Sequence, residues 1–182
     1  MDHQRKTSPD LEELVRLFYD QVDELGQFEE VSVDQLPDTA QTLLAHHSHM
    51  TVTVERFHNS PVDVKVIDRQ TSGNYYSRKI LLNRQSDGQV VQFGIVRLNS
   101  DYLDDEVEQE IKSESIPLGR ALINHNVLRE VQLVGLWRIN PNQELRSLLN
   151  VGEGQIVYGR TALIYCNGEP AIELLEIVTP AE

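Results

Sequence analysis

The spacing of apolar residues along the chain alternates between helical and β-type patterns. Apolar residues repeat at helical spacing over residues 11–22, directly after Ser8 and Pro9, which suit an N-cap and a first helical position. A second short helix carrying Leu43 and Leu44 is predicted after Pro37. The pattern then becomes alternating and β-branched over residues 51–57 and 62–66, which predicts two strands.

Two further pairs of strands are joined by short turns of the hairpin type. Residues 75–82 and 90–98 flank a turn that contains Asp87-Gly88, and residues 157–165 and 171–178 flank Asn167-Gly168. Asp-Gly and Asn-Gly are the strongest short-range signals of an antiparallel hairpin. These strands are therefore predicted to pair in an antiparallel sheet.

The remaining segments complete the pattern. Helical spacing returns around residues 103–111, 118–123 and 141–150, and a long strand is predicted over residues 127–139. Helices grouped at the start and middle of the chain must cover the faces of the sheet. We expect a flexible N-terminus over residues 1–8 and one α+β domain over residues 9–182, an antiparallel β-sheet of about six strands with flanking helices.

Composition and charge exclude several partners. The chain has 182 residues, 16 Lys and Arg against 29 Asp and Glu, and a net charge of −13. Nucleic acids and anionic membranes are bound through clustered cations, so neither is an expected partner. No segment approaches the roughly 20 apolar residues of a membrane helix, and no secretory signal is evident. With a single cysteine, Cys166, the chain needs no oxidising compartment, and a cytoplasmic protein is expected.

The cluster His46-His47-Ser48-His49 is the most conspicuous group of candidate ligands. Adjacent side chains point in different directions, and no cysteine or carboxylate pattern accompanies them. We interpret these histidines as a helix cap and surface residues and predict no metal site. Nothing marks Cys166 as a nucleophile.

Two arginines lie on predicted strands among apolar neighbours. Arg78 shares its strand face with Tyr76, Ile80 and Leu82, and Arg160 shares its face with Tyr158, Ala162 and Ile164. An arginine keeps its charge when buried and therefore needs an anionic partner. That partner is either an internal carboxylate or the carboxylate of a bound ligand.

Glu173 and Glu176 lie in the last predicted strand, three positions apart, and so point to opposite faces that are otherwise apolar. Burial raises the pKa of a carboxyl group unless a nearby cation stabilises the carboxylate. Such a group suits a hydrogen bond to a ligand hydroxyl, or a salt bridge to Arg78 or Arg160, and the sequence leaves both readings open.

Several short segments, in this order along residues 43–180, resemble the chorismate pyruvate-lyase (4-hydroxybenzoate synthase) family in its distant prokaryotic branch. They are His49-Met50-Thr51, Arg78 to Leu82 before Ser86-Asp87-Gly88, Pro117-Leu118-Gly119-Arg120, Tyr158-Gly159-Arg160, Asn167 to Pro170, and Glu176 to Pro180. One segment departs from the family: Gly94-Ile95-Val96-Arg97 stands where better-known members have Gly-Arg-Thr.

The resemblance implies a carbon–oxygen lyase that eliminates pyruvate from chorismate to give 4-hydroxybenzoate for quinone biosynthesis, without metal or cofactor. It assigns Arg78 to the ring carboxylate and Glu176 to the ring hydroxyl. It also implies backbone amides from Leu118 and Gly119, the pyruvate-side carboxylate on Arg160, and Met50 closing the pocket. A shifted register would put Glu173 in the place of Glu176.

The alternative is a non-catalytic module that binds a small molecule such as an aromatic carboxylate. The expected fold also resembles the effector-binding domains of a class of bacterial transcription regulators. Residues 1–40 are too short and too acidic for the winged helix-turn-helix that accompanies such domains. A stand-alone binding module therefore remains the second hypothesis, and no sequence feature indicates an oligomeric state.

Overall fold

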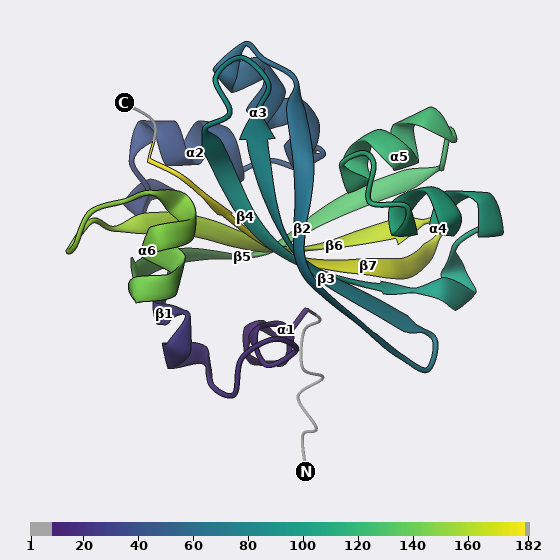
Figure 1. Ribbon diagram of the computed structural model, residues 1–182, viewed down its shortest axis with the longest axis horizontal. Helices are drawn as coiled ribbons and strands as arrows, with labels where there is room; N and C mark the ends of the chain where they lie inside the picture. The colour runs from purple at the N-terminus through teal and green to yellow at the C-terminus, as the bar shows by residue number, and fades with distance from the viewer. Residues whose placement is uncertain (1–8, 181–182) are drawn as a thin grey trace.

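A seven-stranded antiparallel sheet runs through the computed structural model, which describes residues 9–180 (Figure 1). The strands follow the order β1-β5-β6-β7-β4-β3-β2. The strands are β1 (Gly26–Val31), β2 (Val62–Ser72), β3 (Tyr75–Arg84), β4 (Val90–Asn99), β5 (Arg129–Pro141), β6 (Val157–Cys166) and β7 (Glu169–Val178). The helices are α1 (Leu11–Val15), α2 (Asp38–Leu44), α3 (Met50–His58), α4 (Asp105–Lys112), α5 (Leu118–Asn124) and α6 (Gln143–Leu149).

Helices cover both faces of this twisted sheet. Because side chains alternate between faces along a strand, Ile80 and Leu82 pack with α2 and α3, whereas Leu81 between them packs with α1 and α6. The face that carries Ile80 also packs against α4 and α5, so α2 to α5 lie together on it (Figure 1). We call this the four-helix face.

The central strands bring the predicted site residues into two rows on the four-helix face. Arg78 on β3 pairs with Val96 on β4, which pairs in turn with Leu174 on β7. The next row along contains Gly94, Glu176 and Arg160, from β4, β7 and β6. Strand pairing alone therefore places three of the predicted site residues on one face.

The predicted α+β fold with an antiparallel sheet is confirmed, including both hairpins, although the sheet has seven strands rather than about six. The unpredicted strand is β1, which pairs with β5 at the edge of the sheet. None of the described helices is long and apolar enough to cross a membrane.

Two elements differ from the prediction. Residues 51–57, predicted as a strand, belong to α3, because Met50, Thr51 and Val54 lie at helical spacing and are buried there. The first helix ends at Val15 instead of continuing to residue 22, and its N-cap is Asp10, which accepts hydrogen bonds from two backbone amides. The predicted cap Ser8 and the predicted flexible segment 1–8 lie outside the described residues.

Candidate functional site

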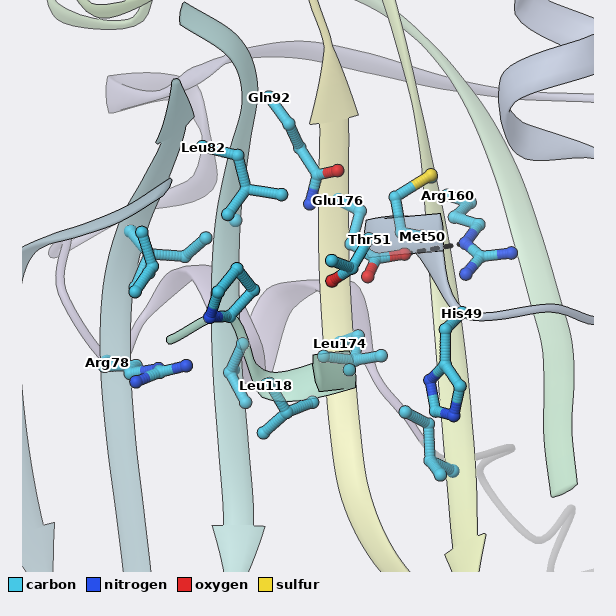
Figure 2. A pocket seen from close by; sticks show the side chains of 17 residues that line it. His49, Met50, Thr51, Arg78, Leu82, Gln92, Leu118, Arg160, Leu174 and Glu176 are labelled. Carbon is cyan, nitrogen blue, oxygen red and sulfur yellow. Dashed lines mark hydrogen bonds and ion pairs between the residues drawn. The ribbon is translucent and has the colours of Figure 1, made fainter. Parts of the chain in front are cut away.

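A small cavity lies between the four-helix face of the sheet and the first residues of α3 and α5 (Figure 2). Its floor consists of residues from β2, β3, β4, β6 and β7, and its roof of residues 49–51 and 117–119. The volume is about 30 Å³. The lining residues are His49, Met50, Thr51, Val64, Arg78, Ile80, Leu82, Gln92, Gly94, Val96, Pro117, Leu118, Gly119, Arg160, Ile164, Leu174 and Glu176.

Arg160 and Glu176 form an ion pair at one side of the cavity. Arg160 Nε lies 2.7 Å from Glu176 Oε2, and the two side chains are 1% and 8% exposed. The guanidinium also donates to the backbone carbonyls of His46 at 3.0 Å and Ser48 at 3.1 Å. Arg160 thus has an internal carboxylate as partner and ties the segment before α3 to the sheet.

Arg78 lies on the opposite side of the cavity in a different electrostatic situation (Figure 2). It is 1% exposed and donates one hydrogen bond, to the carbonyl of Ile111 at 3.0 Å, while its Nε has no hydrogen-bond partner. None of the ion pairs among residues 9–180 includes it. Burial lowers the pKa of Arg78, while the hydroxyl of Tyr76 and the charge of Glu114 act in the opposite direction, and the arginine remains charged at neutral pH. The cavity therefore contains a buried cation that forms no ion pair within the described part of the chain and is compensated only at longer range by Glu114.

Two more buried polar atoms of the cavity wall lack partners among the described residues, Gln92 Oε1 and His49 Nε2. Burial, together with the nearby charges of Arg129 and Arg160, lowers the pKa of His49 to about 4. His49 is therefore neutral at neutral pH. Because buried polar atoms are normally hydrogen-bonded, the unpartnered atoms on three residues around one cavity make it the candidate site of the described part of the chain.

The two polar sides of the cavity are separated by an apolar floor. Arg78 and Glu176 lie two strands and two residues apart, which corresponds to about 12 Å between their Cα atoms. Between them lie Gly94, Val96 and Leu174. Since Gly94 has no side chain, nothing projects into the cavity from the middle of the floor.

Six of the seven predicted site residues line this cavity: Met50, Arg78, Leu118, Gly119, Arg160 and Glu176. Glu173 does not, because it points to the opposite face of β7, where it accepts a hydrogen bond from Arg97 Nε at 2.5 Å. His49 was expected at the surface and is buried instead. Sequence reasoning also missed Gln92, whose position two residues before Gly94 on one strand face could have indicated it.

A cluster of metal ligands and a reactive thiol would be two further kinds of site, and the described residues offer neither. Within residues 9–180, no three His, Cys, Asp or Glu side chains are grouped so that they could hold a metal ion. Cys166 is buried, and burial raises the pKa of its thiol to about 11, so that the unreactive protonated form prevails at neutral pH.

Comparison with known proteins identifies structural relatives only. No family model matches the chain, and no curated protein matches it in sequence. The chain resembles the effector domain of PhnF from Mycobacterium smegmatis, at 9% identity with a TM-score of 0.51, covering 72% of this chain and 88% of that one. A second PhnF structure gives a TM-score of 0.50 at 9% identity, with 72% of this chain and 64% of that one covered. A GntR-family transcriptional regulator from Bacillus cereus gives 0.45 at 14% identity, over 65% of this chain and 92% of the other.

These comparisons overturn the interpretation of the chain as a chorismate lyase. The structures whose fold the chain shares are those of PhnF and its effector domain, and no family model matches the chain. The lyase activity, the chorismate chemistry and the role in quinone biosynthesis expected from the resemblance are therefore wrong. In physical terms, Arg160, expected to hold a second substrate carboxylate, is already occupied by Glu176 and two backbone carbonyls. The chain thus shares the fold of these regulator effector domains.

Proposed function

We propose that the chain is a non-catalytic module that binds a small organic anion, of the carboxylate class, in the cavity beneath α3 and α5. The observation that carries the proposal is Arg78, which is buried against the cavity and forms no ion pair among the described residues. The fold shared with the PhnF effector domain supports a binding role.

Energetics favour an anionic ligand. A buried charge is costly unless it is paired, so a carboxylate that reaches Arg78 would offset a cost already present in the free protein. Such pairing also suits the geometry of a guanidinium, which can donate two parallel hydrogen bonds to one carboxylate. Because the chain carries a net charge of −13, an anionic ligand would be attracted only close to Arg78, inside the cavity.

The side of the cavity away from Arg78 indicates which group the ligand should carry opposite its carboxylate. Gln92 Oε1 has no partner, and only one oxygen of Glu176 is bonded to Arg160. Both offer acceptors, so the ligand should carry a hydrogen-bond donor there, separated from its carboxylate by an apolar body. A hydroxylated aromatic carboxylate has this arrangement.

The proposal is tested by isothermal titration calorimetry with 4-hydroxybenzoate, benzoate and 4-hydroxybenzyl alcohol. We expect wild-type protein to prefer the first, to bind the second more weakly and to bind the alcohol least. Arg78→Gln should weaken carboxylate binding by about 100-fold, since a hydrogen bond between charged groups is worth roughly 1.5–3 kcal/mol.

Arg97→Gln is the matched control, because Arg97 is a strand arginine on the opposite face, paired with Glu173. It should leave the affinity unchanged. Equal affinities for Arg78→Gln and wild type, or no binding of any carboxylate by the wild type, would contradict the proposed function.

A further inference from the structure

The cavity is closed by direct contact between α3 and α5. A Cβ atom on Gly119 would lie 2.9 Å from Thr51 Oγ1 and 3.3 Å from the Cβ of His49. A Cβ atom therefore fits at position 119 only if Thr51 shifts. The two helices therefore meet at this glycine, above the cavity floor.

The closed cavity is too small for the proposed ligand. Its volume is about 30 Å³, whereas a cavity that holds benzene measures about 150 Å³. Binding of a ring-sized molecule thus requires part of the wall to move. Movement of the floor would break backbone hydrogen bonds, because its strands are joined by backbone pairing along their length.

Other parts of the roof are anchored from below. Arg160 holds the carbonyls of His46 and Ser48, and Arg78 holds the carbonyl of Ile111 at the end of α4. The contact between α3 and α5 has a different kind of support. Glu55 of α3 accepts a hydrogen bond from Arg120 of α5 at 2.7 Å, in an ion pair whose side chains are 20% and 38% exposed.

An open groove leads to the same contact from outside. It is lined by Val52 of α3, Ile123 of α5 and residues 127–131, and it shares His49 with the cavity. His49 therefore separates the groove from the cavity, next to Thr51 and Gly119.

We propose that the contact between α3 and α5 is the entrance to the cavity and that the Arg120–Glu55 ion pair is the latch that keeps it closed. This inference rests on the proposed function, since an entrance matters only for a module that admits a ligand. It assigns Arg120 and Glu55 a role in ligand exchange although neither lines the cavity.

The test measures opening without any ligand. In a Cys166→Ala background, Val96→Cys places one thiol on the cavity floor, and Ile95→Cys places one on the opposite face of the same strand. The rate of modification by 5,5′-dithiobis(2-nitrobenzoate) reports how often each thiol is exposed. Opening between α3 and α5 should expose position 96, whereas position 95 should require unfolding.

Glu55→Gln and Arg120→Gln should each accelerate modification at position 96 by about threefold, the effect expected of a partly exposed ion pair. The reversed pair Glu55→Arg with Arg120→Glu should restore the slow rate. Gly119→Ala, which forces Thr51 away, should accelerate it by about tenfold or more. Asp87→Asn, which breaks the Arg84–Asp87 pair of similar length in the β3–β4 turn, should have no effect.

The proposal is overturned if the latch variants leave the rate at position 96 unchanged, or if they accelerate positions 95 and 96 equally. The first result means that the entrance lies elsewhere, and the second that exposure occurs by unfolding. Because no ligand is present, failure of carboxylate binding in calorimetry would contradict the proposed function without changing the outcome at position 96.

Discussion

Arg160 and Glu176 face each other across the β6–β7 pair, with Nε and Oε2 2.7 Å apart and both side chains shielded from solvent. The same guanidinium holds two carbonyls of the segment that precedes α3. One ion pair therefore connects the centre of the sheet with the roof of the cavity. Arg78, at a similar depth, has no such partner, and this contrast leads to the first two predictions.

Glu176→Ala should lower the free energy of unfolding by about 3–5 kcal/mol, because it leaves the buried Arg160 without a counter-charge. The double variant Arg160→Met, Glu176→Met should cost less than Glu176→Ala alone, since no unpaired charge remains. Urea denaturation measures both. A double variant less stable than Glu176→Ala would show that the contacts of Arg160 with His46 and Ser48 outweigh its charge.

Arg78→Met should leave the free energy of unfolding within about 1 kcal/mol of the wild type or raise it, because the substitution removes a buried charge that has no ion-pair partner among the described residues. Arg160→Met, the same substitution at the paired arginine, should lower it by about 3 kcal/mol or more. Thermal and urea denaturation of the two variants decide the matter. Equal losses would indicate that Arg78 has an internal counter-ion in solution.

Gly94→Ala should weaken binding of 4-hydroxybenzoate by about tenfold while acetate, which does not reach the middle of the floor, binds as before. The added methyl group would lie 3.3 Å from the Ile80 side chain, which can yield slightly, so the fold should persist. Gly159→Ala is the contrasting variant. Its Cβ would lie 2.8 Å from the backbone oxygen of Glu176, and it should destabilise the sheet by roughly 1–3 kcal/mol.

His49 should make the protein less stable in acid. Folding lowers its pKa from 6.5 to about 4, mainly through burial, so between these values the unfolded chain binds a proton that the folded chain excludes. Stability from this group is complete above pH 6.5 and is lost as the pH falls to 4, which amounts to about 3 kcal/mol. Urea denaturation from pH 7 to 4 should show a shallower loss for His49→Gln than for the wild type. Thr51→Ala, a change in the same wall without a titrating group, should keep the wild-type slope.

Alternation along strands was the part of the site that the sequence could predict. It placed Arg78 with Ile80 and Leu82 and put Glu173 and Glu176 on opposite faces, as the structure has them. Side-chain direction in a strand is a local property with a period of two, so it needs no knowledge of partners.

Partners were harder to predict, because they depend on register. Counting back from the Asn167-Gly168 turn pairs Arg160 with Leu175, but a bulge between Ile164 and Tyr165 shifts the pairing by one residue and places Glu176 opposite Arg160. The internal counter-ion of Arg160 therefore depends on this shift.

Tertiary packing decided the remaining differences. Residues 51–54 are all β-branched, yet burial of Met50 and Val54 against the sheet makes the segment a helix. The Pro117-Leu118-Gly119 motif has a local packing reason in the close approach of α5 to Thr51, and a motif set by packing does not specify a reaction.

The central position of β7 affects the order in which the molecule can be completed. During synthesis β4 and β6 leave the ribosome before β7, and each then has a free edge where β7 will pair. Arg160 remains without Glu176 until that strand inserts, and the two halves of the cavity floor stay apart. A nascent chain that stops before residue 169 should therefore hold two aggregation-prone edges and half a binding site, so expression as truncated fragments should fail where the complete sheet succeeds.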